Sequence, residues 1–190
     1  MTAILVNTFF EDGLQNLFDL AERIERAFAA AGLDYRIVGG LAAYLYIEQA
    51  IPDAGRLTRD IDVVVRREDI QKIADVVEQF GLEYRRAAGI DMLVQKDQPS
   101  ARRAIHLLFA GEKVRPDYPE AAPNLGKPHN VRGLRLVALS DLVRMKLTSF
   151  RLKDQTHLKD LDEAGLITPE IEEHLSELLL QRLQHVRDQE

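Results

Sequence analysis

Apolar residues recur every three to four positions in several segments of the chain, the spacing that places them on one face of a helix. The clearest segment runs from 13 to 31, and Gly32 follows where a helix C-cap is expected. The same spacing predicts a helix over 70–80, which Gly81 ends. The apolar run at 41–50 predicts a further helix with little polar surface.

Short apolar runs between turn-forming residues predict strands. One is YRIV, which ends at Gly39-Gly40, and the next is DIDVVV at 60–65, apolar enough to be buried on both faces. Three more predicted strands follow, with the sequences LEYRRA, DMLVQK and RRAIHLLFAG. Together they predict an α+β fold, a mixed sheet of about five strands with helices packed on it.

Prolines mark the segment 112–133, where four of them exclude regular structure and predict a wrapping loop or a linker. The chain beyond it is predicted to be helical. We therefore expect an α/β core at 1–112, and at 113–190 a Pro-rich loop plus a C-terminal helical subdomain that packs with the core as one unit.

Capping residues divide the helical region into three segments. Ser140 is a predicted N-cap for a helix over 141–152, and a second, short helix is expected to end at Gly165. Thr168-Pro169 form an N-cap and N1 pair that predicts a last helix through Leu183.

Composition places the chain among ordinary globular proteins. Its 190 residues are 46% hydrophobic and 29% charged, and no apolar run approaches the roughly 18 residues of a membrane span. The first residues, MTAILVNTFFEDG, lack the basic and apolar pattern of a secretion signal, so a cytoplasmic location without membrane attachment is the expectation. The absence of cysteine leaves carboxylates and five histidines as candidate metal ligands, a set that favours a hard cation.

Charge is distributed unevenly around a net value of −6, which argues against a broad nucleic-acid surface. Residues 131–160 carry seven Lys or Arg against three Asp, whereas 161–190 carry two Arg against eight acids. The basic middle is a candidate for contact with phosphates, and the acidic end is expected to face water.

Two aspartates, Asp60 and Asp62, stand at the start of the predicted strand 60–65. Residues two apart on a strand point to the same face, so the two carboxylates are expected together. Such a pair suits Mg²⁺, which usually takes one or two carboxylates and completes its shell with water and phosphates. An isolated Asp-x-Asp is also common in solvated turns, so the pair alone does not decide between the two interpretations.

Gly39-Gly40 lie at a predicted strand-to-helix junction. Free backbone N–H groups and the helix dipole make such a junction an anion site, and the missing side chains let phosphates approach closely. A tight turn that needs positive φ is the alternative. The whole series of strand, diglycine, helix, loop and Asp-x-Asp strand is more specific than either part.

The stretch VGGLAAYLYI…LTRDIDVVV resembles the first motif of the DNA polymerase beta-like nucleotidyltransferase superfamily. The later stretch LSDLVRMKLTSFRLKDQTHLKDL is similar to the helical region of its AbiEii-type branch, the nucleotidyltransferase toxins of bacterial toxin–antitoxin systems. The two resemblances cover about 35–65 and 134–165. The first motif is specific to the superfamily, and the second is looser.

The resemblance implies transfer of a nucleoside monophosphate from a nucleoside triphosphate to an acceptor hydroxyl on an RNA end such as tRNA, a protein or a small molecule. Gly39 and Gly40 would hold the triphosphate, and Asp60 and Asp62 would bind Mg²⁺, with Mn²⁺ as the alternative. Arg59, beside the acids, is a candidate phosphate ligand. An antitoxin protein is an implied partner.

Lys146 is anomalous on its own evidence, because it falls in the middle of the apolar arc of the helix 141–152. A lysine is almost never buried without a partner, so it either extends its ammonium to water or meets an anion such as a nucleotide phosphate. Asp154 matches a downstream acidic position of the family and would orient Lys146 or Arg151. A plain helix cap is the alternative for Asp154.

The chain departs from the superfamily at His106, which stands where a third carboxylate is expected. Three interpretations follow: His106 is the general base on the acceptor hydroxyl, the metal preference is altered, or the fold is catalytically degenerate and serves as a nucleotide- or partner-binding module. A hydrogen-bonded histidine at a strand end is the plain alternative. The other histidines, including His157, are expected at the surface.

Overall fold

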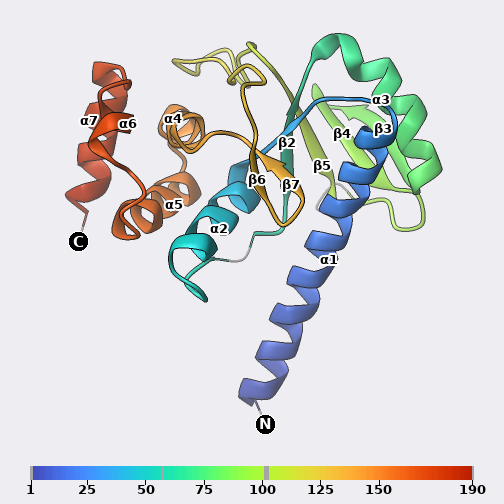
Figure 1. Ribbon diagram of the computed structural model, residues 1–190, viewed down its shortest axis with the longest axis horizontal. Coiled ribbons are helices and arrows are strands. Elements are labelled where there is room, and N and C mark those ends of the chain that lie inside the picture. The colour runs from blue at the N-terminus through green and yellow to red at the C-terminus, as the bar shows by residue number, and fades with distance from the viewer. Residues whose placement is uncertain (1, 57, 101–102, 190) are drawn as a thin grey trace.

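The computed structural model describes the backbone of residues 2–56, 58–100 and 103–189, with side chains from residue 13 onward (Figure 1). Its helices are α1 Thr2–Ala30, α2 Gly39–Ala50, α3 Ile70–Val77, α4 Leu139–Ser149, α5 Leu152–Glu163, α6 Pro169–Glu172 and α7 Glu177–Arg187. Its strands are β1 Arg36–Val38, β2 Ile61–Val65, β3 Leu82–Ala87, β4 Ile90–Gln95, β5 Ile105–Phe109, β6 His129–Val131 and β7 Leu134–Leu136.

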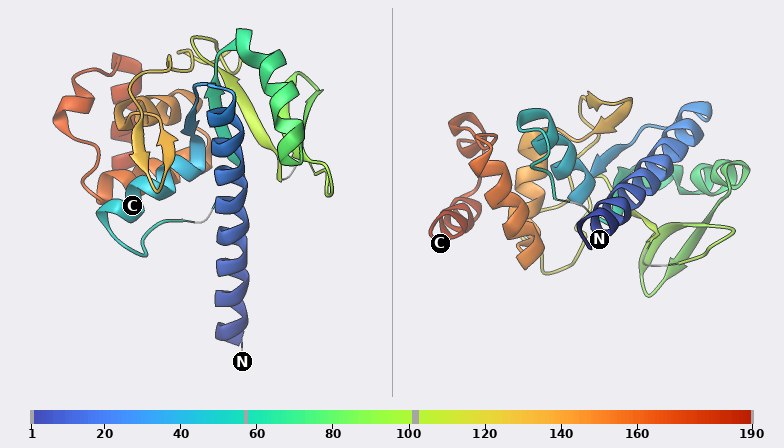
Figure 2. Two further views of the ribbon diagram at one scale, coloured as in Figure 1. Left: turned by 45° about the vertical axis from the view of Figure 1, so that its right-hand side comes forward. Right: turned by 90° about the horizontal axis from the view of Figure 1, so that it is seen from below.

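The strands form one mixed sheet in the order β3-β4-β5-β2-β1-β7-β6. The pairs β2–β5 and β1–β7 are parallel, and the other neighbours are antiparallel. Helices α4 to α7 gather at one end of the molecule, and α1 and α3 lie towards the other (Figure 1). The first turns of α1 extend away from the body (Figure 2). The predicted mixed sheet with flanking helices is confirmed.

The expected strand number was wrong, because the sheet has seven strands and not about five. The two missed strands, β6 and β7, form a hairpin at the end of the Pro-rich segment, where no regular structure was predicted. Arg132 and Gly133 turn it with φ of +50° and +80°, and all four prolines precede it. Three-residue strands are too short to produce a readable alternation, so the sequence pattern did not reveal them.

Three helices also differ from their predicted bounds. Helix α1 begins at Thr2, well before the predicted start at 13. The last predicted helix starts after Thr168 with Pro169 at its first turn, as expected, but it is divided into α6 and α7. The N-cap position of α4 is Ala138 rather than Ser140. The described helices contain no stretch apolar and long enough to cross a membrane.

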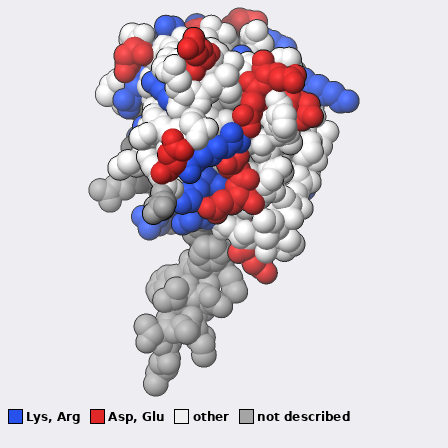
Figure 3. Space-filling view, turned by 90° about the vertical axis from the view of Figure 1, so that its left-hand side faces the viewer, with Lys and Arg blue, Asp and Glu red and all other residues white. Residues whose placement is uncertain are grey.

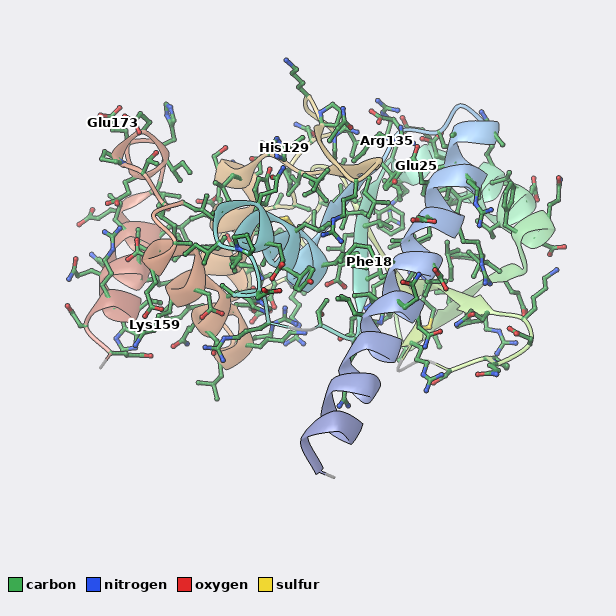
Figure 4. All side chains as sticks on the ribbon, turned by 60° about the horizontal axis from the view of Figure 1, so that its bottom comes forward. Phe18, Glu25, His129, Arg135, Lys159 and Glu173 are labelled. Carbon is green, nitrogen blue, oxygen red and sulfur yellow. The ribbon has the colours of Figure 1, made fainter. Side chains whose placement is uncertain are left out.

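Charged contacts attach α1 to the sheet. Glu25 of α1 and Arg135 of β7 point towards one another (Figure 4), with Arg135 Nε 3.2 Å from Glu25 Oε2. The Arg135 guanidinium lies 4.3 Å from the centre of the Tyr35 ring, and the Tyr35 hydroxyl donates to Glu25. This network fixes the start of β1, and therefore the place where β1 passes into α2.

Helix α2 supplies the centre of the core, with seven consecutive buried residues from Leu41 to Ile47. Leu45 is 1% exposed, whereas Leu152 at the start of α5 is 82% exposed. Burial on all sides explains why the α2 sequence shows no polar face.

We expect Leu45→Ala to lower the free energy of unfolding by about 2 to 5 kcal/mol, because it leaves a cavity in the core. Leu152→Ala, the same change at an exposed position, should alter it by less than about 0.5 kcal/mol. Urea denaturation followed by circular dichroism measures both. Equal effects of the two substitutions would contradict the packing described for α2.

Candidate functional site

The site forms on a row of residues that crosses four strands of the sheet. Asp62 in β2 is paired with Val38 of β1 on one side and with His106 of β5 on the other. Met92 of β4 is paired with His106 and extends the row. Because residues paired across a sheet point to the same face, Asp62 and His106 meet, with 3.2 Å between His106 Nδ1 and Asp62 Oδ1.

The diglycine lies against this row. Gly39 begins α2 directly after β1, with a φ of +69°. A Cβ atom added to Gly39 would lie 2.2 Å from Asp62 Oδ2, and one added to Gly40 would lie 2.4 Å from Thr58 Oγ1. Position 39 therefore favours glycine for two reasons: its φ is positive, and Asp62 leaves little room for a Cβ atom. The structure brings the start of α2 and the Asp62 carboxylate into direct contact.

The two aspartates are not neutralised by arginines among the described residues. Asp60 stands just before β2 and is half-buried, and its ion-pair partner is Lys153 of α5, whose Nζ lies 4.0 Å from Asp60 Oδ2. Asp62 has His106 as its partner. Arg59 is exposed. Both carboxylates therefore keep oxygen atoms available for a cation.

His106 is held by the neighbouring acid. The hydrogen bond with Asp62 raises the pKa of His106, and burial opposes this shift only in part. An ionised Asp62 accepts from Nδ1–H, which leaves Nε2 as the ring nitrogen able to accept a proton.

A second charged group faces the same space from the helical region. Lys146 of α4 is 2% exposed, and its Nζ lies 2.8 Å from His157 Nδ1 and 3.8 Å from Asp154 Oδ1. Burial lowers the pKa of Lys146 to about 8, although Asp154 and Asp62 favour the charged form. Lys146 thus meets the Asp154 carboxylate and does not extend to water, and its contact with a nucleotide phosphate stays a prediction.

Asp154 contacts Lys146 and Arg151 and also caps the start of α5. Its carboxylate accepts from Arg151 Nε at 2.7 Å and from Ser149 Oγ at 2.8 Å, and it forms a capping box with Arg151 at the start of α5. Burial raises the pKa of Asp154, but the hydrogen bond from Arg151 and the charge of Lys146 outweigh this, so the net shift is downward. Asp154 therefore stays ionised beside Lys146.

His157 was expected at the surface, and that expectation was wrong. Its Nδ1 accepts a hydrogen bond from the Lys146 ammonium. Burial and the charge of Lys146 lower the pKa of His157 to about 4, so the ring is neutral near pH 7. The sequence offered no signal for this contact, because the two residues lie on different helices.

A cavity of about 280 Å³ connects these groups. Of the predicted site residues, Gly39, Asp62, His106, Lys146 and Asp154 line it, whereas Gly40, Arg59 and Asp60 lie outside its lining. Sequence reasoning missed several further lining residues from α4, from its C-terminal end and from the Pro-rich segment, namely Thr148, Arg151, Arg115 and Tyr118. Thr148 Oγ1 is buried and has no hydrogen-bond partner within the described residues.

The metal-binding capacity of the site rests on two carboxylates. Among the described residues no group of three or more His, Asp or Glu side chains is arranged to hold a metal ion. Asp60 and Asp62 alone would supply a pair of oxygen ligands. Such a set fits Mg²⁺ only in combination with water and phosphate oxygens.

Comparisons with solved structures assign the fold. An antigenic nucleotidyltransferase-like protein from Paracoccidioides brasiliensis has a TM-score of 0.59 at 18% identity, over 90% of this chain and 86% of its own. The crystal structure of ANT(2")-Ia in complex with adenylyl-2"-tobramycin has a TM-score of 0.53 at 16% identity, over 88% of this chain and 97% of its own. No family model and no curated protein matches the chain. The predicted nucleotidyltransferase-like fold is confirmed, and the AbiEii-type branch stays a prediction.

Gly39→Ala tests the contact between α2 and Asp62. We expect it to destabilise the protein by at least about 2 kcal/mol more than Gly133→Ala. Both substitutions place alanine at positive φ, but only at position 39 would the new Cβ atom meet another side chain, that of Asp62. Urea denaturation measures both. Similar losses for the two variants would mean that Asp62 moves freely aside.

The contact of His157 with Lys146 leads us to expect a loss of stability in acid. The depressed pKa of His157 means that the unfolded chain binds a proton first as pH falls from about 6.5 to about 4, so the free energy of unfolding falls in that window, by on the order of 2 kcal/mol. His157→Asn, which keeps an acceptor that does not titrate, should flatten this dependence. His174→Asn, a change at an exposed histidine, serves as the control and should leave the dependence as it is. An unaltered acid slope in His157→Asn would contradict the Lys146–His157 contact.

Proposed function

We propose that this protein is a metal-dependent nucleotidyltransferase, which transfers a nucleoside monophosphate from a nucleoside triphosphate to an acceptor hydroxyl. The observation that carries the proposal is the contact between Gly39 and Asp62. It joins the start of α2, which no side chain of the described residues caps and which would bind an anion through its backbone N–H groups, to a carboxylate that would ligate a cation. A metal-chelated triphosphate needs both at once.

Each named residue has a role that its surroundings support. The N–H groups of Gly39 and Gly40 at the start of α2 would hold phosphate oxygens. Arg59, which is exposed and lies outside the cavity lining, would be a further phosphate ligand. Lys146, held in place by His157 and Asp154, would present its ammonium to the same phosphates.

The metal proposed is Mg²⁺, with Mn²⁺ as the alternative that His106 makes chemically reasonable. Asp60 and Asp62 would hold it, and when bound it would neutralise charge on the reacting phosphoryl group.

His106 is the proposed general base. The acceptor oxygen attacks the α-phosphorus, the bond to the β-phosphate bridging oxygen breaks, pyrophosphate leaves, and the acceptor proton passes to His106 Nε2. Asp62 orients the ring for this step through Nδ1. His106 in place of a third carboxylate also supports a second candidate function, in which the same site binds nucleotide without turnover.

The finer assignment to AbiEii-type toxins is part of the proposal and rests on the resemblance of 35–65 and 134–165. Under this assignment the acceptor of the nucleotide would be a tRNA end or a protein. The partner of this protein would be an antitoxin. A neighbouring gene for a small antitoxin-like protein would support it.

Calorimetric titration with nucleoside triphosphates and Mg²⁺ tests the site. We expect Asp60→Asn/Asp62→Asn to weaken metal-dependent binding at least tenfold, because both proposed oxygen ligands lose their charge. Asp97→Asn/Asp188→Asn, the same change at exposed positions, should leave binding unaltered. Equal affinity of the wild type and the first variant would exclude this site. Binding without transfer of labelled nucleotide to any acceptor in a lysate would favour the second candidate function.

A further inference from the structure

The geometry of the proposed reaction determines from which side the acceptor enters. In-line displacement places the attacking oxygen opposite the leaving pyrophosphate. In the proposed function the phosphates are held by Lys146 and by the start of α2 at Gly39, which follows β1 on the side of β2 away from β5. The acceptor therefore enters across His106, on the side of the sheet formed by β5 and β4.

The wall of the cavity on that side is apolar. Leu108, two residues after His106 on β5, points to the same face, and Ile90 at the start of β4 lies beyond it. The Pro-rich segment closes the other side with Val114 and Tyr118. Ile90 is 50% exposed and Val114 is 44% exposed, so both present apolar surface to whatever enters. Large exposed apolar side chains that share one cavity mark a ligand-binding wall.

We propose that the acceptor is a phenol-type hydroxyl, carried on a compact aromatic body that packs against Ile90, Leu108, Val114 and Tyr118. The inference rests on the proposed nucleotidyl transfer and names its acceptor class. A free phenolic compound and a tyrosine side chain share this chemistry.

The charges around the cavity disfavour a polyanionic acceptor such as an RNA end. RNA binding needs free Lys and Arg side chains, but those of the basic stretch 131–160 are largely engaged with acids. Arg144 pairs with Asp141 and Glu120, and Arg151 pairs with Asp154. On the face of the C-terminal helices, acidic and basic side chains lie next to one another (Figure 3).

A polycationic acceptor is disfavoured for the converse reason. Besides Asp62, the described carboxylates that line the cavity are Glu120 and Asp154. Glu120 accepts from Ser176 and faces Arg144, and Asp154 is held by Arg151 and Ser149. Neither carboxylate is left to bind an ammonium group of a ligand.

An aromatic ring fits the remaining contacts. The Arg115 guanidinium lies 5.8 Å from the centre of the Tyr118 ring, so an aromatic and a planar cationic group stand together at the entrance, and both stack on rings. A phenol also loses its proton near pH 10, far more readily than an aliphatic alcohol, which suits an imidazole base.

Binding of the acceptor is measured first, without nucleotide. N-acetyl-tyrosinamide is titrated into the wild-type protein and observed by saturation-transfer NMR, with N-acetyl-serinamide as the aliphatic hydroxyl and a short RNA with a free 3′-hydroxyl as the polyanion. We expect the tyrosine compound alone to bind. Ile90→Ser/Val114→Ser should weaken that binding at least fivefold. Ile51→Ser/Leu178→Ser changes side chains of similar exposure, 45% and 44%, outside the cavity and should leave the binding unaltered.

Transfer is measured second, with labelled nucleoside triphosphate and Mg²⁺. We expect Ile90→Ser/Val114→Ser to raise the KM for the phenolic acceptor about tenfold and to leave the KM for the nucleotide unchanged. A tyrosine-containing peptide that is modified faster than N-acetyl-tyrosinamide would identify a protein acceptor, and the reverse order a small molecule.

Different results would overturn the phenolic acceptor and the proposed nucleotidyl transfer. Binding of nucleotide and Mg²⁺ together with preference for the RNA or the serine compound would overturn the phenolic acceptor and leave nucleotidyl transfer intact. Equal binding of the tyrosine compound by Ile90→Ser/Val114→Ser and by its control, Ile51→Ser/Leu178→Ser, would also overturn the phenolic acceptor. Absence of metal-dependent nucleotide binding would overturn the proposed function, while the first experiment still decides whether the apolar wall binds an aromatic ring.

Discussion

The site depends on the close approach of the α2 backbone to the Asp62 carboxylate. A helix that starts at Gly39 with no side chain can lie directly on a strand that carries an acid, because no Cβ atom stands between the helix backbone and the carboxylate. This brings together a helix start, a kind of group that favours anions, and a carboxylate, a kind of group that favours cations. Strand β5 then adds His106 to the same row, and the parallel β2–β5 pairing sets its distance from Asp62.

Charge burial in the helical region is the second constraint. Lys146 is almost fully buried yet stays close to an ionised partner, because Asp154 and a neutral His157 satisfy its ammonium. Asp154 is itself fixed by Arg151 at the start of α5. Such a network is stable only when every member is in place, so it holds α4 and α5 together and directs a cation at the sheet. The side of the cavity formed by Lys146 and Asp154 is therefore charged.

The sequence predicted most of the fold because the signals for its longer elements are local. Periodicity identified the central helices, and apolar runs identified the strands that carry Asp62 and His106. The strands β6 and β7 were missed because three residues are too few for a pattern. The pairing of β7 with β1 is a contact about a hundred residues apart in the chain.

For the site, the sequence by itself determined the residue types and the order in which the chemistry-bearing positions occur: a diglycine, an acid pair and a lysine on an apolar arc. The tertiary structure decided which of them meet. It brought Gly39, Asp62, His106 and Lys146 to one cavity and left Arg59 outside its lining. It also added the contact of His157 with Lys146 and the apolar wall. Local spacing determines on which face a side chain lies, whereas contact between faces depends on how separate elements pack, and that information is spread over the whole core.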